Sequence, residues 1–162
     1  MAILALSLVA RFLYLGLSIH ANGGDLLQTI SGADGYYAVS QNLIEGNGLS
    51  SDAAAPYAPY SFRPPLYHFF IAGSYFLFGG YRGVIILQVI IGSLLPVLGY
   101  FLASYLTENR KVWSVVGVLL AIEPSSILYS TFFYSETLFM FWFLLALLFL
   151  FAYLRDTKRA HL

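Results

Sequence analysis

Long apolar runs with few charged residues occupy most of this chain, and they constrain its fold more than any other feature. They cover residues 3–20, 84–106, 112–135 and 137–154. A helix needs about 20 apolar residues to cross a hydrocarbon core of roughly 30 Å. Only 10% of the residues are charged, against about 25% in soluble domains. The sequence therefore predicts an all-α membrane protein with about four transmembrane helices in the lipid bilayer.

The longest polar interval falls between the first two spans, at residues 21–82, and holds half of the eight acidic residues. Within it Tyr36, Val39 and Leu43 recur at helical spacing. They predict a short amphipathic helix on the membrane surface, with Asp34 at its N-cap and Gly46 at its end.

A second short helix is expected at residues 65–79, which are apolar and follow a proline pair. These residues extend only about 22 Å as a helix, too short to cross the bilayer comfortably. We therefore expect a long first extracytoplasmic loop with juxtamembrane helices.

Basic residues predict the orientation. With four spans, Arg110, Lys111, Arg155, Lys158 and Arg159 share one side, which the positive-inside rule makes cytoplasmic. Asp34 and Glu136 then both face outward. A five-span arrangement, in which residues 65–79 cross, also satisfies the rule if the N-terminus is outside, and it separates these two acids. The short length of 65–79 favours four spans.

No basic residue opens the first run and no cleavage site is clear, which favours a span there over a signal peptide.

Two charges lie within the apolar runs. Arg11 interrupts the first run, and Glu123 stands before Pro124, where a helix is expected to kink. A charge in a span usually faces a partner or a cavity. We expect Arg11 and Glu123 at similar depth, either paired with each other or lining a transport path.

Candidate site residues gather at the outward face. The chain has no cysteine, no phosphate-binding glycine loop and only three scattered histidines; its net charge of zero suggests no nucleic-acid partner. A carboxylate can act as a general base, and an arginine can hold a phosphate through paired hydrogen bonds. The group comprises the carboxylates of Asp34 and Glu136, the guanidinium groups of Arg63 and Arg82, and the rings of Tyr37, Tyr67 and His68. It suits a lipid-phosphate substrate. No motif defines a cofactor, and a divalent metal is left open.

Structural roles are the alternative for each of these residues. Asp34 and Glu136 both stand where a helix cap is expected. Arg63 and Arg82 can extend to lipid head groups. His68 can be a packed side chain at the membrane interface.

Several motifs, in order, resemble the type C membrane glycosyltransferases, a family that includes protein O-mannosyltransferases and the lipid A aminoarabinose transferase. They are Asp34-Gly35-Tyr36-Tyr37-Ala38, Gly46-Asn47-Gly48, Arg63-Pro64-Pro65-Leu66-Tyr67, Leu77-Phe78-Gly79, the stretch from Ala121 to Ser130 around Pro124, and Ser135-Glu136-Thr137-Leu138-Phe139. The resemblance covers nearly the whole chain.

The resemblance implies an inverting sugar transfer from a polyprenyl-phosphate donor to a hydroxyl of an acceptor protein, lipid or glycan. Asp34 matches the base that deprotonates the acceptor, and Arg63 matches the residue that binds the donor phosphate. Glu136 matches a second acidic position with a supporting role. The implied location is the plasma (inner) membrane or the endoplasmic reticulum, with an extracytoplasmic active site.

Two departures from the family pattern stand out. Gly35 replaces the second acidic residue that many relatives carry after the base, and family members are much longer than 162 residues. We therefore expect residues 1–162 to be the N-terminal transmembrane module of a longer protein. The alternatives to an enzyme are a non-catalytic membrane module or subunit that binds polyprenyl phosphate, and a small transporter.

Overall fold

The protein is built from helices. A computed structural model describes residues 1–31 and 35–160, and all regular secondary structure within them is helical, which confirms the predicted fold class. The helices are α1 (Ala2–Ala21), α2 (Leu26–Ile30), α3 (Tyr36–Ile44), α4 (Pro65–Phe78), α5 (Tyr81–Leu106), α6 (Arg110–Ile122), α7 (Pro124–Thr131) and α8 (Glu136–Ala160).

Three of the described helices are long and apolar enough to cross a membrane. They are Ala2–Ala21, Tyr81–Leu106 and the Glu136–Arg155 part of α8. Helices α6 and α7 pass the same test only together, and they meet at a bend of 50°. The protein thus has three candidate spans, or four if the bent pair counts as one.

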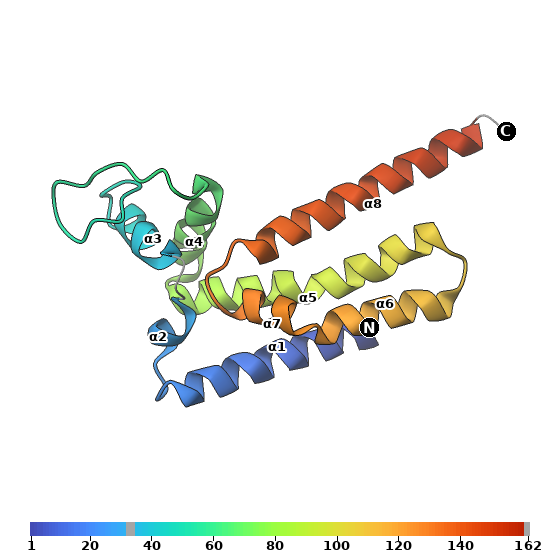
Figure 1. Ribbon diagram of the computed structural model, residues 1–162, viewed down its shortest axis with the longest axis horizontal. Coiled ribbons are helices and arrows are strands. Elements are labelled where there is room, and N and C mark those ends of the chain that lie inside the picture. Colours follow the sequence, from blue (N-terminus) through green and yellow to red (C-terminus); the bar gives the residue numbers. More distant parts are fainter. Residues whose placement is uncertain (32–34, 161–162) are drawn as a thin grey trace.

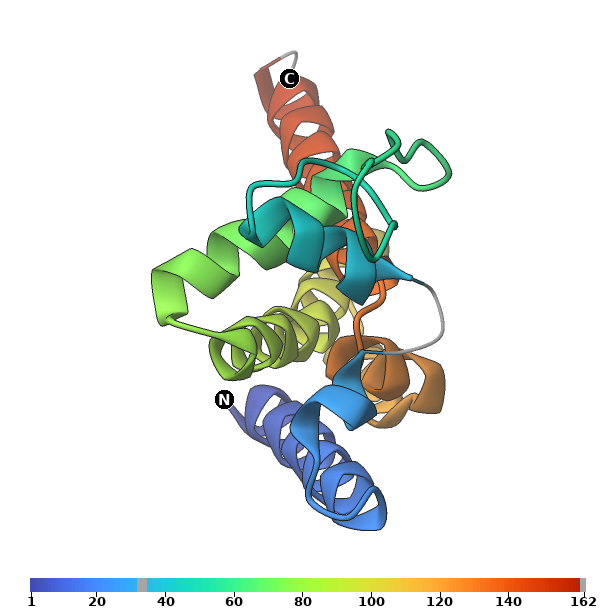
Figure 2. The same cartoon turned by 90° about the vertical axis from the view of Figure 1, so that its left-hand side faces the viewer.

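Helix α5 is the central element, since it contacts α1, α4, α6, α7 and α8. Figure 1 shows α1, α5 and α6 side by side, while α8 diverges from them toward its C-terminal end. The short helices α2, α3 and α4 gather at one end of the bundle, and the α5–α6 turn lies at the other. Figure 2, turned by 90°, shows α3 and α4 in front of α8 and above the ends of α1 and α5.

Close contact between α5 and α7 depends on Gly92. A Cβ atom at this position would lie 2.5 Å from Ser130 Cβ and 3.2 Å from Arg11 Nε. Small residues let helix backbones approach in membrane proteins. Gly92 therefore lets α7 pack against α5 beside the Arg11 side chain of α1.

The bend between α6 and α7 lies at Glu123, as the Glu123-Pro124 pair predicts. The Glu123 carboxylate accepts hydrogen bonds from the backbone N–H groups of Ser125 (2.9 Å) and Ser126, and so caps α7. Proline at the first position of α7 suits a helix start, because its missing N–H would have no partner there.

Arg11 is fully buried beside this bend, but its hydrogen bonds go elsewhere than to Glu123. Its guanidinium donates to the hydroxyl of Ser126 at 2.6 Å and to that of Ser7. It also reaches the Ala121 carbonyl at 3.4 Å. Ser126 therefore links Arg11 with Glu123. A direct pair was one of the two arrangements expected, but the Glu123 carboxylate caps α7 instead.

The loop end of the bundle has its own hydrophobic core. Its buried members come from α1 to α5 and from the turn before α8: Leu15, Ile30, Tyr36, Tyr67, Ile71, Val84, Ile85, Val89 and Phe133. The backbone N–H of Phe133 donates to the Ile30 carbonyl at 2.8 Å, which ties the turn to α2. The short helices are thus packed onto the spanning helices.

Helix α3 begins at Tyr36, with Gly35 as its N-cap residue. Gly35 has φ of +76°, a left-handed conformation that glycine adopts readily. Asp34, the predicted N-cap, lies outside the described residues. The predicted end of the helix agrees with the structure, since α3 stops at Ile44 and Gly46 has φ of +85°.

Candidate functional site

Tyr36, the first residue of α3, lies at the centre of a group of polar and aromatic side chains. It is only 2% exposed. Its ring centroid lies 4.7 Å from that of Tyr67 and 5.1 Å from that of His68. Its hydroxyl donates a hydrogen bond to Ser135 Oγ at 3.0 Å. One buried tyrosine therefore contacts α4 and the turn that leads into α8.

Arg63 lies over the face of Tyr36. Its Cζ atom is 5.3 Å from the Tyr36 ring centroid and 5.4 Å from that of Phe62. A guanidinium is attracted to an aromatic face by the ring's electron distribution. The proline pair at 64–65 starts α4 directly after Arg63, which fixes the backbone at this point. The arginine side chain is half-buried, so it is held more firmly than a freely extended surface arginine.

Glu136 is the first residue of α8 and is half-buried. Its Oε2 lies 3.5 Å from Ser135 Oγ, the atom that accepts the Tyr36 hydrogen bond. A carboxylate in the first turn is also favoured by the helix dipole. Glu136 thus lies at the same end of the bundle as Tyr36 and Arg63, the arrangement that four spans predict.

Tyr67 and Gln88 form a buried hydrogen bond between α4 and α5. Burial raises the pKa of Tyr67 well above its usual value, so this hydroxyl stays protonated. The Gln88 amide donates to the backbone carbonyls of Tyr129, at 2.9 Å, and Phe132. Gln88 therefore holds the end of α7 and the turn that carries Ser135.

Sequence reasoning missed Gln88, Ser135 and the central role of Tyr36. A signal existed for Gln88, because it is the only amide side chain in the apolar run at residues 84–106. A polar side chain in a span usually has a partner. The contacts of Tyr36 depend on tertiary packing and had no local signal.

His68 is buried among Tyr36, Tyr60 and Ser40. Its Nδ1 lies 3.4 Å from Ser40 Oγ, and its ring centroid lies 5.9 Å from that of Tyr60. Burial lowers the pKa of His68, and the nearby positive charge of Arg63 lowers it further, while a backbone hydrogen bond at Tyr36 opposes both. The ring is therefore neutral at pH 7.

Two hollows adjoin Arg63 and Pro64. One has a volume of about 350 Å³ and apolar walls; it is lined by Tyr36, Pro64, Leu66, Tyr67, Ser135, Leu138, Phe139 and Trp142. The other has a volume of about 450 Å³ and is lined by Leu49, Tyr60, Ser61, Phe62, Arg63, Pro64, Pro65 and His68. Pro64 lines both hollows, and Arg63 lines only the second, more polar one.

The other predicted residues have other contacts or lie outside the described residues. Tyr37 packs against Tyr81, with ring centroids 5.2 Å apart. Arg82 is exposed on the first turn of α5. Asp34 is not described, although Gly35 directly precedes Tyr36. Among the described residues, no three His, Cys, Asp or Glu side chains are placed to hold a metal ion.

The fold and this site define a helical membrane protein with a polar group beside an apolar hollow at one end of its bundle. Residues 52–161 match the family model of dolichyl-phosphate-mannose-protein mannosyltransferases. The match covers more than half of the chain, so the protein belongs to that family, and the resemblance seen in the sequence is confirmed. It is a mannosyltransferase-like glycosyltransferase of the membrane. No curated protein and no solved structure matches the chain.

The matched residues include most of the predicted site. Arg63, Tyr67, His68, Arg82 and Glu136 fall inside the segment, whereas Asp34 and Tyr37 precede it.

Proposed function

We propose that the protein transfers a sugar from a polyprenyl-phosphate donor to a hydroxyl group of an acceptor protein at the extracytoplasmic face of its membrane. The single observation that carries this proposal is the position of Arg63 over the ring of Tyr36, a residue that lines the apolar hollow between α4 and α8. A polyprenyl-phosphate sugar needs a cation for its phosphate and an apolar surface for its isoprenoid chain. The family's printed name specifies a dolichyl-phosphate-mannose donor and a protein acceptor.

In this proposal Arg63 binds the donor phosphate, and the isoprenoid chain runs along Leu66, Leu138, Phe139 and Trp142. Charge-assisted hydrogen bonds to phosphate are stronger than neutral ones. Three of these side chains are well exposed: Leu66 (67%), Phe139 (64%) and Trp142 (56%). The sugar then extends toward the hollow lined by Tyr60, Ser61 and His68. Arg82 is assigned a weaker share in phosphate binding, as an exposed cation at the same end of the bundle.

The chemical step in this proposal is a single displacement. Asp34 accepts the proton of the acceptor hydroxyl as its oxygen forms a bond to C1 of the sugar. The bond between C1 and the phosphate oxygen breaks, and the phosphate leaves with the electron pair, stabilised by the guanidinium of Arg63. Because the oxygen attacks opposite to the leaving phosphate, the configuration at C1 inverts.

Glu136 has a supporting role in this scheme. It stands next to Ser135, which binds the Tyr36 hydroxyl. The Glu136 carboxylate can also orient the acceptor molecule, by accepting a hydrogen bond from one of its hydroxyl or amide groups.

The test is a transfer assay with the full chain in lipid nanodiscs, using a polyprenyl-phosphate mannose donor and a serine- and threonine-containing acceptor peptide. We expect Asp34→Asn to abolish transfer and leave donor binding within about twofold. Arg63→Ala should weaken donor binding by about tenfold or more. Asp25→Asn is the matched control, because Asp25 caps α2 in the same loop.

The outcomes separate the candidate functions. Donor binding that requires Arg63, without transfer in any variant, would point to the non-catalytic lipid-binding module. Transfer that persists in Asp34→Asn would exclude the base role. The transporter reading has little support, because Arg11 is fully buried and its guanidinium hydrogen-bonds to serine hydroxyls.

A further inference from the structure

A third hollow lies at the opposite end of the bundle from the site described above. It has a volume of about 450 Å³ and opens between the end of α5 and the C-terminal part of α8. Its lining residues are Ser104, Tyr105, Leu106, Thr107, Glu108, Phe151, Leu154 and Arg155. It shares no residue with either hollow beside Arg63, so it is a separate feature of the molecule.

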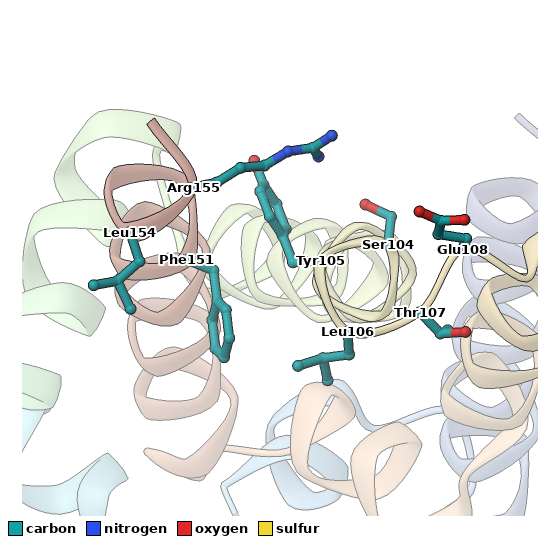
Figure 3. A pocket seen from close by; sticks show the side chains of 8 residues that line it. All are labelled: Ser104, Tyr105, Leu106, Thr107, Glu108, Phe151, Leu154 and Arg155. Atoms are coloured by element: carbon teal, nitrogen blue, oxygen red, sulfur yellow. The ribbon is translucent and has the colours of Figure 1, made fainter. Parts of the chain in front are cut away.

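The hollow is divided into a polar edge and an apolar floor. Figure 3 shows the guanidinium of Arg155, the hydroxyl of Ser104 and the carboxylate of Glu108 along one edge, with Leu106, Phe151 and Leu154 below them. A charged edge above apolar side chains at the end of a membrane-spanning helix matches the division of a phospholipid into head group and acyl chain.

Arg155 is held in a defined position by an aromatic ring. Its Cζ atom lies 5.8 Å from the centroid of Tyr105. A contact with the face of a ring orients a guanidinium. The N–H groups point outward in the plane of the guanidinium, so they can still donate to a ligand at its edge. Such a guanidinium presents hydrogen-bond donors toward a phosphate, and the geometry of the fork suits two phosphate oxygens.

The opposite part of the edge presents acceptors. Ser104 donates its hydroxyl proton to the Phe101 carbonyl at 2.6 Å, so its oxygen lone pairs are what it offers to the hollow. Glu108 is exposed and contributes a carboxylate. A ligand that places a phosphate at Arg155 must therefore place a hydrogen-bond donor, preferably a cation, near Glu108 and Ser104.

We propose that this hollow binds a glycerophospholipid with a primary ammonium head group, of the phosphatidylethanolamine type. Its phosphate binds Arg155, its ammonium group donates hydrogen bonds to Glu108 and Ser104, and an acyl chain lies on Leu106, Phe151 and Leu154. A purely anionic lipid meets repulsion from Glu108. A choline head group carries no N–H and cannot donate to these acceptors.

The experiment is native mass spectrometry of the full chain in detergent, titrated with dioleoyl phosphatidylethanolamine, phosphatidylglycerol or phosphatidylcholine. We expect the ethanolamine lipid to bind at least about threefold more tightly than the other two, as one favourable exposed ion pair provides. Arg155→Gln should weaken binding of all three lipids by about threefold to fivefold. Glu108→Gln should weaken the ethanolamine lipid alone and improve binding of the glycerol lipid.

Two controls make the result specific to the hollow. Arg110→Gln removes an exposed positive charge at the same end but outside the hollow, and Glu45→Gln removes an exposed acid at the other end. Neither should change lipid preference. Soluble glycerophosphoethanolamine, which has the same head group without acyl chains, should bind far more weakly than the intact lipid.

Each contrary result overturns a defined part of the proposal. Equal binding of the three lipids would remove the ammonium contact, and Arg155→Gln behaving like Arg110→Gln would remove the site itself. Binding of the soluble head group as tight as that of the lipid would remove the acyl-chain contact with α5 and α8. Circular dichroism of each variant checks that its helix content is unchanged.

Discussion

The hydroxyl of Tyr36 donates a hydrogen bond to Ser135 Oγ at 3.0 Å, which joins two residues that lie 99 positions apart in the chain. This bond connects the first turn of α3 to the start of α8. Arg63 lies over one face of the same tyrosine ring, and Glu136 follows Ser135. Tyr36 therefore sets the relative positions of the guanidinium and the carboxylate in the proposed site.

The first prediction concerns this bond. Tyr36→Phe keeps the ring under Arg63 and removes only the hydroxyl, so we expect a loss of about 0.5–1.5 kcal/mol in the free energy of unfolding, the usual contribution of one hydrogen bond. Transfer activity should fall more than this loss of stability explains, because Ser135 loses its hydrogen bond to α3 and keeps only its contact with Glu136 among those described. Thermal unfolding in detergent and the transfer assay measure the two effects.

Ser135→Ala provides the comparison for this prediction. If the bond acts as described, the double variant should be no less stable than the single variants. Additive losses would show that the two hydroxyl groups act independently. Tyr37→Phe is the matched control, since it removes the hydroxyl of the neighbouring tyrosine, whose ring packs on Tyr81.

The second prediction concerns Gln88. Gln88→Leu leaves the Tyr67 hydroxyl and the Tyr129 and Phe132 carbonyls without this partner. We expect a loss of stability of about 1–2 kcal/mol, the upper range for side-chain hydrogen bonds between membrane helices. Hydrogen exchange should increase at residues 129–135, because Gln88 holds that turn.

Gln41→Leu is the control for Gln88→Leu, because the Gln41 amide donates to the exposed Glu45 carboxylate four residues away, at 3.0 Å, within the same part of the chain. It should change the unfolding temperature little. Equal effects of the two substitutions would mean that the α5 amide does not organise the turn.

The sequence predicted the helical membrane class and the position of the bend, because long apolar runs and a proline act locally. It also brought Arg63 and Glu136 to one end, because residues 65–79 are too short to cross the bilayer comfortably and so favour four spans. It could not predict that Tyr36 lies between them, because this depends on how α3 folds back onto α4. It placed Arg11 and Glu123 at similar depth, either as a pair or along a transport path, but it could not predict that Ser126 links them, because depth along a helix says nothing about which partner a carboxylate prefers. The backbone N–H groups of α7 take that carboxylate.

The third prediction concerns pH. The pKa of His68 is below its usual value of 6.5 because the ring is buried near Arg63. The unfolded chain therefore binds a proton at His68 at a higher pH than the folded protein does, so the stabilising contribution is present above about pH 6.5 and is lost as pH falls. The unfolding temperature should drop between pH 7.5 and pH 5.

His68→Gln should make this drop smaller, since it removes the titrating group. The matched control is His20→Gln, which removes an exposed histidine at the end of α1. A pH profile identical in the wild type and His68→Gln would assign the acid sensitivity to other groups.

The fourth prediction concerns the contact of α5 with α7. Gly92→Ala places a Cβ atom 2.5 Å from Ser130 Cβ, too close for both helices to keep their positions. We expect a loss of stability of about 1–3 kcal/mol, as for other overpacked sites. To make room for the new Cβ atom, α7 has to move away from α5. The Arg11 side chain is also displaced, because its Nε lies 3.2 Å from that atom. Gly16→Ala is the matched control, because a Cβ atom there meets no other atom within 4 Å, and alanine favours a helix by up to about 1 kcal/mol. Thermal unfolding of both variants in one detergent decides the matter: a Gly92→Ala protein as stable as Gly16→Ala would mean that α5 and α7 are not in this close contact.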